Sequence, residues 1–594
     1  MSLIMILFPC ALLLLSSYVS AGTIEQTFLV QTQVFNRLCK DQYTTVVNGS
    51  LPGPTIYANE GDTIIVHLIN DSPYNMSIHW HGVKQTLSCW ADGVAFITQC
   101  PIQPGQKFVY KFKLSGQEGT LWWHAHLGFY RATVYGAIVI YPKVGTSYPF
   151  SKPDEEQLII LGEWWNRNVT ELQDELDETG VGPDSSDANL INGFPGDMYS
   201  CSLSSDRRRR FLKNQENSSL ELSDVGSYPE PGTFRLKVTS GKTYLLRIIS
   251  ASLNPCIFFK IANHNMVIVA TDASYTNPFN TDVIIISPGQ TIDVLLTANQ
   301  PPGLYYMTTS VFVNSHVQFR DIPGTAILEY EDVGIFQSVP KLPNIPSHYD
   351  RDLFYNSMKH LTSLVSSPFW TPVPLEVDEN MFITIGLGFQ PCNSRNPNQI
   401  CAFLEYRMAG SLSNITFKLP TKMSILEAHY NKVDGIYTNN FPNNPPLTFD
   451  FTDERYMFDL EKLMTELGTK VKRLKYNSTV EIVFQSTTLF TAENHPMHLH
   501  GFNFHILGHG FGNYSPLKHQ EKLNLVNPVL ASTVSVPGNG WVVIRFRANN
   551  PGVWFLHCHN EGHLAIGLAT VFIVEDGPTS STSLPKPPED YPRC

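Results

Sequence analysis

One stretch near the end of the chain, Gly552-Val553-Trp554-Phe555-Leu556-His557-Cys558-His559, says most about its fold. An apolar, aromatic run of this length, opened by a glycine, is typical of a buried strand. Successive side chains of a strand point to opposite faces. His557 and His559 are therefore expected to face one side while Cys558 faces the other. The thiolate can then bind one metal and the two imidazoles a second group, with only a few covalent bonds between them.

The same pattern occurs twice in the chain. The stretch above follows His495-Pro496-Met497-His498-Leu499-His500-Gly501, and near the beginning Ser77-Ile78-His79-Trp80-His81-Gly82 precedes Gly119-Thr120-Leu121-Trp122-Trp123-His124-Ala125-His126. In both copies a His-X-His pair comes first, a glycine-led aromatic run carries a second pair, and an apolar strand follows. Such an internal repeat predicts two copies of one β-domain.

Short strand-like runs separated by turn signals recur along the whole chain. Pro and Gly number 41 and 39, and only 16% of residues are charged. This texture predicts an all-β chain of sandwich type. A length of 594 residues exceeds one hydrophobic core, so several domains are expected. The strand-like runs are Thr63–Leu68, Phe108–Leu114, Ala137–Tyr141, Gln157–Leu161, Tyr244–Ile249, Val267–Ala270, Val283–Ile286, Val480–Phe484, Val542–Phe546 and Ala569–Val574.

Charge and the N-terminal residues exclude several classes of protein. A formal net charge of −12 argues against nucleic-acid binding. Residues 1–21 read as a secretory signal, because the apolar run Leu3–Leu15 is followed by the small residues Val19-Ser20-Ala21. No later run of about 18 apolar residues exists, so no membrane segment is expected after cleavage. Eight Asn-X-Ser/Thr sites agree with secretion: Asn48, Asn70, Asn75, Asn168, Asn217, Asn414, Asn477 and Asn513.

The histidine clusters indicate a metal centre. One His-X-His pair is a weak signal, but four pairs ordered by a repeat, with a cysteine inside one of them, point to bound metal. A cysteine with two histidines is the ligand set of blue copper, and His495 and His563 are the natural partners of Cys558. Structural zinc sites are closed sets of four ligands. Eight clustered imidazoles with a separate thiolate set therefore favour redox copper.

At these residues the sequence closely resembles the multicopper oxidases, and among them the plant laccases, over nearly the whole mature chain. The resemblance implies three cupredoxin-like Greek-key β-sandwich domains, with copper ligands only in the first and third. The expected divisions are a signal peptide at 1–21, domains at 22–146 and 147–330, a linker with irregular structure at 331–405, and a third domain at 406–594. Other stretches that share the pattern are Asn48–Thr55, Trp90–Gly93, Ile97–Ile102, Arg131–Gly136 and Pro592–Cys594.

The resemblance also implies four coppers per chain, one of type 1, one of type 2 and two of type 3. His495, Cys558 and His563 match the type 1 ligands, and His79 and His498 match the type 2 ligands. The residues that match the ligands of the type 3 pair are His81, His124, His126, His500, His557 and His559.

Three further residues match functional positions of the family. Leu568 matches the axial position of the type 1 copper, where ascorbate oxidases carry methionine. An apolar axial residue is expected to raise the potential of that copper. Asp92 and Glu561 lie where the family places acids that supply protons for oxygen reduction. The acid that fungal laccases carry after the cysteine matching Cys256 is absent, so no base for the phenol proton is assigned.

The disulfide pattern is also taken from the resemblance. It pairs Cys100 with Cys594 and Cys39 with Cys256. The neighbouring pair Cys392 and Cys401 is expected to bond locally, which leaves Cys89 and Cys201 for each other.

The implied activity is that of a laccase, secreted into the apoplast or cell wall and expected to be a monomer. Small phenols, such as monolignols or flavonoids, would each give one electron, and dioxygen would take four and become water. The sequence leaves open whether lignin or flavonoid chemistry is the role. An ascorbate oxidase is disfavoured by Leu568, an oxidase of ferrous iron by the lack of placeable carboxylates, and a copper-free binding protein by the complete ligand set.

Overall fold

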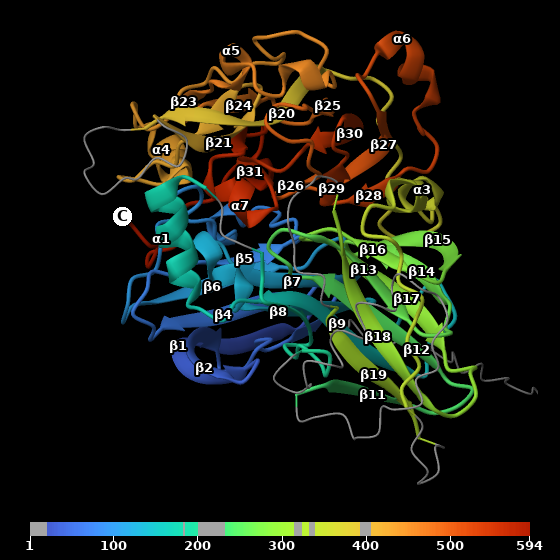
Figure 1. Ribbon diagram of the computed structural model, residues 1–594. Helices are drawn as coiled ribbons and strands as arrows, with labels where there is room; N and C mark the ends of the chain where they lie inside the picture. Colours follow the sequence, from blue (N-terminus) through green and yellow to red (C-terminus); the bar gives the residue numbers. More distant parts are fainter. Residues whose placement is uncertain (1–20, 182–184, 200–231, 314–322, 332–338, 393–404) are drawn as a thin grey trace, which may run out of the picture.

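The computed structural model describes residues 21–181, 185–199, 232–313, 323–331, 339–392 and 405–594. Over these residues the chain is mostly β and forms three cupredoxin-like sandwich domains (Figure 1). All ten predicted strand-like runs lie within observed strands or overlap them, which confirms the all-β fold. The predicted signal peptide, apart from Ala21, lies outside the described residues.

The first domain consists of two four-stranded sheets, ordered β2-β1-β4-β6 and β3-β8-β7-β5. Strand β6 shows the alternation that drives this packing, since Phe108, Tyr110 and Phe112 are buried in the core while its three lysines, Lys107, Lys111 and Lys113, are exposed. The strands are β1 (Thr23–Arg37), β2 (Lys40–Val47), β3 (Ile56–Asn59), β4 (Thr63–Asn70), β5 (Ile78–His81), β6 (Lys107–Lys113), β7 (Gly119–Ala125) and β8 (Tyr135–Tyr141).

The second domain packs a six-stranded sheet, β10-β9-β12-β17-β14-β15, against a five-stranded sheet, β11-β19-β18-β13-β16. Its buried core is mostly aliphatic, with the aromatic residues Tyr244, Phe259, Tyr305 and Tyr330 among its members. The strands are β9 (Glu155–Trp164), β10 (Ala188–Ile191), β11 (Phe234–Val238), β12 (Thr243–Ser250), β13 (Cys256–Ile261), β14 (Met266–Thr271), β15 (Ser274–Thr281), β16 (Ile284–Ile286), β17 (Thr291–Thr297), β18 (Leu304–Phe312) and β19 (Thr325–Tyr330).

The third domain packs an eight-stranded sheet, β23-β22-β21-β20-β25-β30-β27-β28, against a five-stranded sheet, β24-β32-β31-β26-β29. Its strands are β20 (Glu379–Pro391), β21 (Tyr406–Leu412), β22 (Ile415–Phe417), β23 (Glu466–Gly468), β24 (Val471–Leu474), β25 (Ser478–Ser486), β26 (His495–Leu499), β27 (Phe504–Phe511), β28 (Val529–Ala531), β29 (Thr533–Val536), β30 (Gly540–Ala548), β31 (Gly552–Cys558) and β32 (Ala569–Val574).

The structure differs from the expected linker in one respect. Strand β20 lies inside the segment 331–405, yet it pairs in parallel with β25 at the centre of the third domain's large sheet. The side chains of Met381, Ile383 and Ile385 in this strand are buried in the core of the third domain. Because the surrounding segment is rich in proline, the sequence pattern did not predict this strand, which belongs to the third domain.

Helices are short and lie outside the sheets. They are α1 (Val169–Thr179), α3 (Arg351–His360), α4 (Ile425–Asn431), α5 (Leu460–Leu463), α6 (Pro516–His519) and α7 (Glu561–Ala565). In the described part of the chain, no helix is both long and apolar enough to cross a membrane. The sequon at Asn70 is buried, and its side-chain amide donates to the carbonyls of Tyr74 and Ile102, so it is closed to glycosylation in the folded chain.

The cysteines correct part of the predicted disulfide pattern. Cys100 and Cys594 form the expected bond. Cys256 is a free, buried thiol beside Ser287, so the predicted pair with Cys39 is wrong; Cys39 is disulfide-bonded to another partner. Cys89 is also free and buried, which rules out its predicted pair with Cys201. Cys392 is disulfide-bonded, and the expected partner Cys401, like Cys201, lies outside the described residues.

Candidate metal centre

Four strands of two domains carry the histidine pairs to one place. Strand β5 pairs with β7 in the first domain, and β26 pairs with β31 in the third. Both pairs of strands are buried along their whole length, because the residues between the histidines are apolar or aromatic. The histidines of the first domain thus meet those of the third across the domain boundary.

The eight imidazoles form three groups, within each of which the possible ligand atoms lie within 4.8 Å of one another. Two contacts join the domains or the strands directly: His559 Nε2 lies 3.2 Å from His81 Nδ1, and His500 Nε2 lies 3.1 Å from His557 Nε2. The groups are His79 with His81 and His498, His81 with His124 and His559, and His126 with His500 and His557.

A separate fourth group surrounds the cysteine. Cys558 Sγ lies 3.5 Å from His563 Nδ1 and 3.9 Å from His495 Nδ1. Cys558 is fully buried at the end of β31, and its main chain passes directly into His557 and His559 on either side. Helix α7 returns the chain so that His563 faces the thiol, and Gly410 of β21 packs against Leu568 behind it.

The donor set fits copper. The Nε2 atoms of four buried histidines have no hydrogen-bond partner among the described residues, and such orphaned nitrogens are rare in folded proteins unless they bind a ligand. Burial also lowers the pKa of the imidazoles, to about 3 at His557, which keeps their lone pairs free for a cation. The orphaned atoms belong to His79, His124, His126 and His498, and the pKa is lowered well below its usual value at His81, His124, His126, His498, His500 and His559.

Asp92 lies against the imidazoles from the first domain. Its Oδ2 atom is 3.0 Å from His500 Nδ1, its Oδ1 atom is 3.3 Å from His79 Nδ1, and its carbonyl accepts from the same His79 nitrogen at 2.8 Å. The carboxylate is fully buried. It therefore orients one histidine from each of the two domains.

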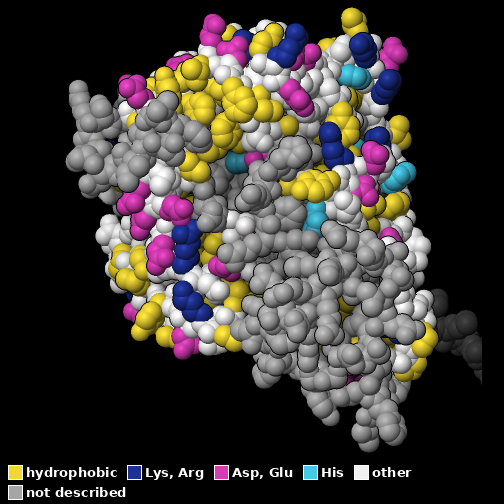
Figure 2. Space-filling view, viewed as in Figure 1, with side chains coloured by type: hydrophobic (Ala, Val, Ile, Leu, Met, Phe, Trp, Pro, Cys, Tyr) yellow, Lys and Arg dark blue, Asp and Glu magenta, His cyan; other side chains and the backbone are white. Residues whose placement is uncertain are grey.

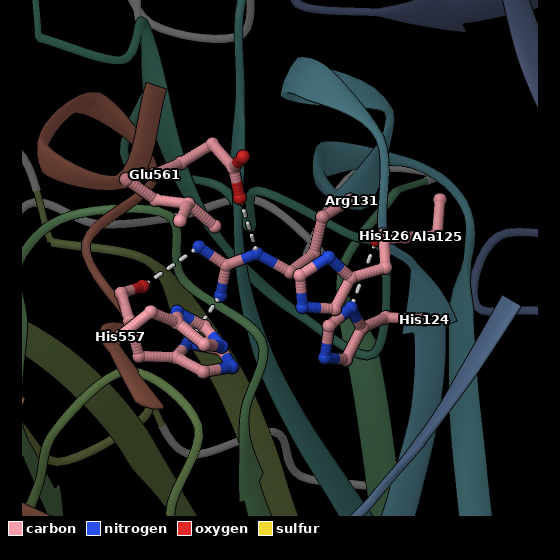
Figure 3. Close-up of a pocket in the computed structure, with 8 residues that line it drawn as sticks. His124, Ala125, His126, Arg131, His557 and Glu561 are labelled. Atoms are coloured by element: carbon pink, nitrogen blue, oxygen red, sulfur yellow. Dashed lines mark hydrogen bonds and ion pairs between the residues drawn. The ribbon is translucent and has the colours of Figure 1, made fainter. Parts of the chain in front are cut away.

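Glu561 lines a small pocket beside the imidazoles, together with Arg131 and Leu564 (Figure 3). Arg131 Nε donates to Glu561 Oε2 at 3.0 Å, and Arg131 Nη1 donates to His559 Nδ1 at 2.7 Å. Burial raises the pKa of Glu561, while the adjacent guanidinium acts in the opposite direction. Figure 3 shows the guanidinium between the carboxylate and the histidines.

A carboxylate also lies at the cysteine group. Glu493 Oε2 is 3.0 Å from His563 Nε2. Burial lowers the pKa of His563, but its hydrogen bonds with Cys558 and Glu493 outweigh burial and raise it to about 10. The side chain of His563 is 11% exposed and that of Glu493 is 25% exposed, so this edge of the group reaches the surface.

Sequence reasoning missed two of these residues. Glu493 stands two residues before His495, and its nearness in sequence to a ligand candidate was a usable signal. Arg131 lies in the stretch Arg131–Gly136, which was noted only for its resemblance. Its contacts with Glu561 and His559 span more than 400 residues of sequence, so no local pattern could reveal them.

Comparisons with known proteins agree with this geometry. Family models described as multicopper oxidase match residues 29–145, 155–332 and 440–578. The chain belongs to the multicopper oxidase family, and it binds copper.

Within that family, its similar plant relatives are laccases. Laccase-7 of Arabidopsis thaliana is 49% identical over 98% of both chains, and Laccase-24 of Oryza sativa subsp. japonica is 46% identical over 99% of both. Among solved structures, a laccase from Botrytis aclada matches with a TM-score of 0.71, 25% identity and coverage of 96% of this chain and 89% of that one. Fet3p, a multicopper oxidase that functions in iron import, shares the fold at a TM-score of 0.66 and 23% identity, covering 93% of this chain and 90% of that one.

Proposed function

We propose that this chain is a laccase that oxidises phenolic substrates one electron at a time and reduces dioxygen to water. The observation that carries the proposal is the arrangement of His557, Cys558 and His559 on one buried strand. The thiolate group and the imidazole groups are thereby joined by a few covalent bonds. The plant relatives, laccases over their whole length, support the same activity.

Four coppers per chain are assigned as follows. His495, Cys558 and His563 would hold a type 1 copper, with Leu568 as an apolar neighbour that is not a ligand, and His79 and His498 would hold a type 2 copper. The histidines that hold the type 3 pair are His81, His124 and His559 for one copper, and His126, His500 and His557 for the other. Bound copper supplies one-electron oxidation at the cysteine group and four-electron reduction of dioxygen at the imidazole groups.

The surface near the cysteine group suits an aromatic donor. Hydrophobic side chains gather over α5 and β23 of the third domain on the face shown in Figure 2. Phe389, Tyr406 and Phe490 pack in one hydrophobic cluster with Leu463 of α5, and Phe490 stands three residues before Glu493. A phenol that docks here meets the exposed edge of His563. The carboxylate of Glu493 orients that imidazole and disfavours anionic donors such as ascorbate.

Two acids serve oxygen reduction. Asp92 orients His79 and His500 and holds a carboxyl group at the imidazole groups. Glu561 supplies a second carboxyl group at the small pocket, where Arg131 holds it in place. Copper-bound histidines do not readily give up protons, so acids at these two positions are the donors for the water that forms.

The chain is further proposed to be a secreted monomer of the apoplast or cell wall, acting in lignin or flavonoid chemistry. Eight sequons and the apolar N-terminal segment support secretion, with the site at Asn70 excluded by burial. Detection of the glycosylated protein in the extracellular fluid of a producing plant cell would test the compartment.

The test of the activity is oxygen uptake by purified holoprotein. The expected result is a blue protein with four coppers per chain that consumes oxygen with a monolignol or a flavonoid, faster than with ascorbate or ferrous iron. Ferrous iron belongs in the comparison because Glu493 places one carboxylate at His563, which the sequence did not predict there. Uptake with ferrous iron alone would reject the laccase proposal.

A further inference from the structure

The second domain carries no assigned copper ligand, but one of its carboxylates reaches the segment that contacts the imidazole groups. Asp272 lies in the tight turn between β14 and β15, where it and Ala273 adopt positive φ angles of 45° and 53°. Its side chain is buried and crosses the domain boundary to Ser532, which joins β28 to β29, and to Thr533, the first residue of β29. Non-glycine residues in this backbone region are strained, and such strain persists where the surrounding contacts fix it.

Three backbone N–H groups and one hydroxyl group surround this carboxylate, and the hydroxyl of Ser532 donates to Oδ2 at 3.4 Å. Thr291 N donates to Oδ1 at 2.9 Å, and Ser532 N and Thr533 N donate to Oδ2 at 3.0 and 3.1 Å. Burial raises the pKa of Asp272 to about 6, while these donors act in the opposite direction. Both oxygens must accept. An asparagine there would turn its NH₂ group toward an N–H donor.

The two residues that Asp272 holds in turn hold two histidines. Ser532 O accepts from His498 Nδ1 at 2.8 Å, and Thr533 Oγ1 lies 3.1 Å from both His498 Nδ1 and His81 Nε2. The proton on His498 Nδ1 leaves Nε2 unprotonated, and that atom has no hydrogen-bond partner among the described residues. Contacts to the second nitrogen of a ligand histidine fix its tautomer and its orientation.

We infer that Asp272 is a positioning residue for the copper held by His79 and His498, acting through the backbone of Ser532 and Thr533. The inference rests on the copper assignment proposed above. It gives the second domain a part in the imidazole centre, since removal of this carboxylate takes three hydrogen bonds from the segment that sets the tautomer of His498.

The test compares copper retention in Asp272→Asn and the wild-type holoprotein. We expect the variant to lose the type 2 copper to a chelator about 10- to 100-fold more readily, with a weakened type 2 EPR signal. The blue absorption of the Cys558 group should remain. Asp197→Asn is the matched control, because Asp197 accepts from Tyr306 and Thr325 inside the second domain, away from the copper groups. It should keep the wild-type EPR signal.

A second variant covers failure of Asp272→Asn to fold. Thr533→Val keeps the shape and removes the hydroxyl that contacts His498 and His81, so it should also weaken the type 2 copper. In the double variant the losses should be smaller than the product of the single effects, because both act through one segment. Multiplying losses, or unchanged EPR and copper retention in a folded Asp272→Asn, would overturn the inference. If the wild type itself is neither blue nor able to consume oxygen, the proposed function fails instead.

Discussion

At the scale of single residues, the thiol of Cys558 distinguishes the type 1 group from the three imidazole groups. Cys558 is the only cysteine among the four ligand groups, and the eight imidazoles belong to other side chains. Cys558→Ser should therefore abolish phenol oxidation and the blue colour, since a hydroxyl is a poor ligand for copper of this type. The other copper sites should still fill. Copper analysis and visible spectroscopy measure both effects, and intense blue absorption in the variant would contradict the assignment of Cys558.

A substitution at Leu568 can change the redox potential of the type 1 copper while leaving the ligands of the imidazole groups unchanged. Its side chain is fully buried, and its carbonyl accepts from Cys558 N at 3.1 Å. Leu568→Met conserves volume and should cost less than about 1.5 kcal/mol of stability. An axial thioether stabilises oxidised copper, so we expect a lower type 1 potential and the largest rate loss with the phenols hardest to oxidise. Redox titration is the measurement, with Leu564→Met as a nearby control. An unchanged potential would show that Leu568 is not axial.

The two acids are tested by substitutions that keep their shape. Asp92→Asn and Glu561→Gln keep the size and shape of each side chain but remove the proton donor. We expect full copper loading and normal reduction of the type 1 copper, with oxygen turnover slowed by roughly 10²-fold. Stopped-flow reoxidation by oxygen measures the loss. Wild-type turnover in both variants, with copper content verified, would reject their role as donors, whereas loss of copper would reduce them to orienting residues.

At the scale of elements, strand alternation explains why so much was predictable. An HxH pair on a buried strand places both imidazoles on one face whatever the rest of the fold does. The sequence could therefore predict that these eight histidines lie together, as they do in the structure. Strand alternation does not predict which residues of other domains contact these histidines. Arg131, Asp272 and the free thiol of Cys256 depend on how the three domains pack, which no local pattern encodes.

One glycine shows how closely these elements approach. Gly93 has φ +82°, and a Cβ there would lie 1.7 Å from the carbonyl oxygen of Ile78, in the strand that carries His79 and His81. Gly93→Ala should displace β5 and deplete copper from the imidazole groups. Gly105 is the control, since its φ is +78° but a Cβ would meet nothing within 4 Å. Gly105→Ala should therefore show only the backbone strain, about 1 kcal/mol in thermal unfolding. Equal copper content in the two variants would refute the argument.

At the scale of the whole molecule, the imidazole centre is assembled by all three domains. Asp92 of the first domain and Thr533 of the third domain each contact ligand histidines. Asp272 of the second domain accepts a hydrogen bond from the backbone of Thr533. Binding of copper should therefore depend on the packing of the three domains. Loss of copper and unfolding of the protein should be coupled.

The C-terminal segment bears on this assembly, because it closes over the loop that carries Asp92. Trp90 Nε1 donates to Pro585 O at 2.8 Å, Tyr591 donates its hydroxyl proton to Thr98 O at 2.6 Å, and the Cys100–Cys594 bond ties the end. Cys594→Ser should lower stability by about 2–4 kcal/mol. It should also speed hydrogen exchange at the amide of Cys100, which donates to Pro592 O. The double variant Cys100→Ser/Cys594→Ser, which leaves no new thiol, should match the single one. Wild-type melting and exchange in both would mean that the noncovalent contacts of Trp90 and Tyr591 suffice to hold the segment.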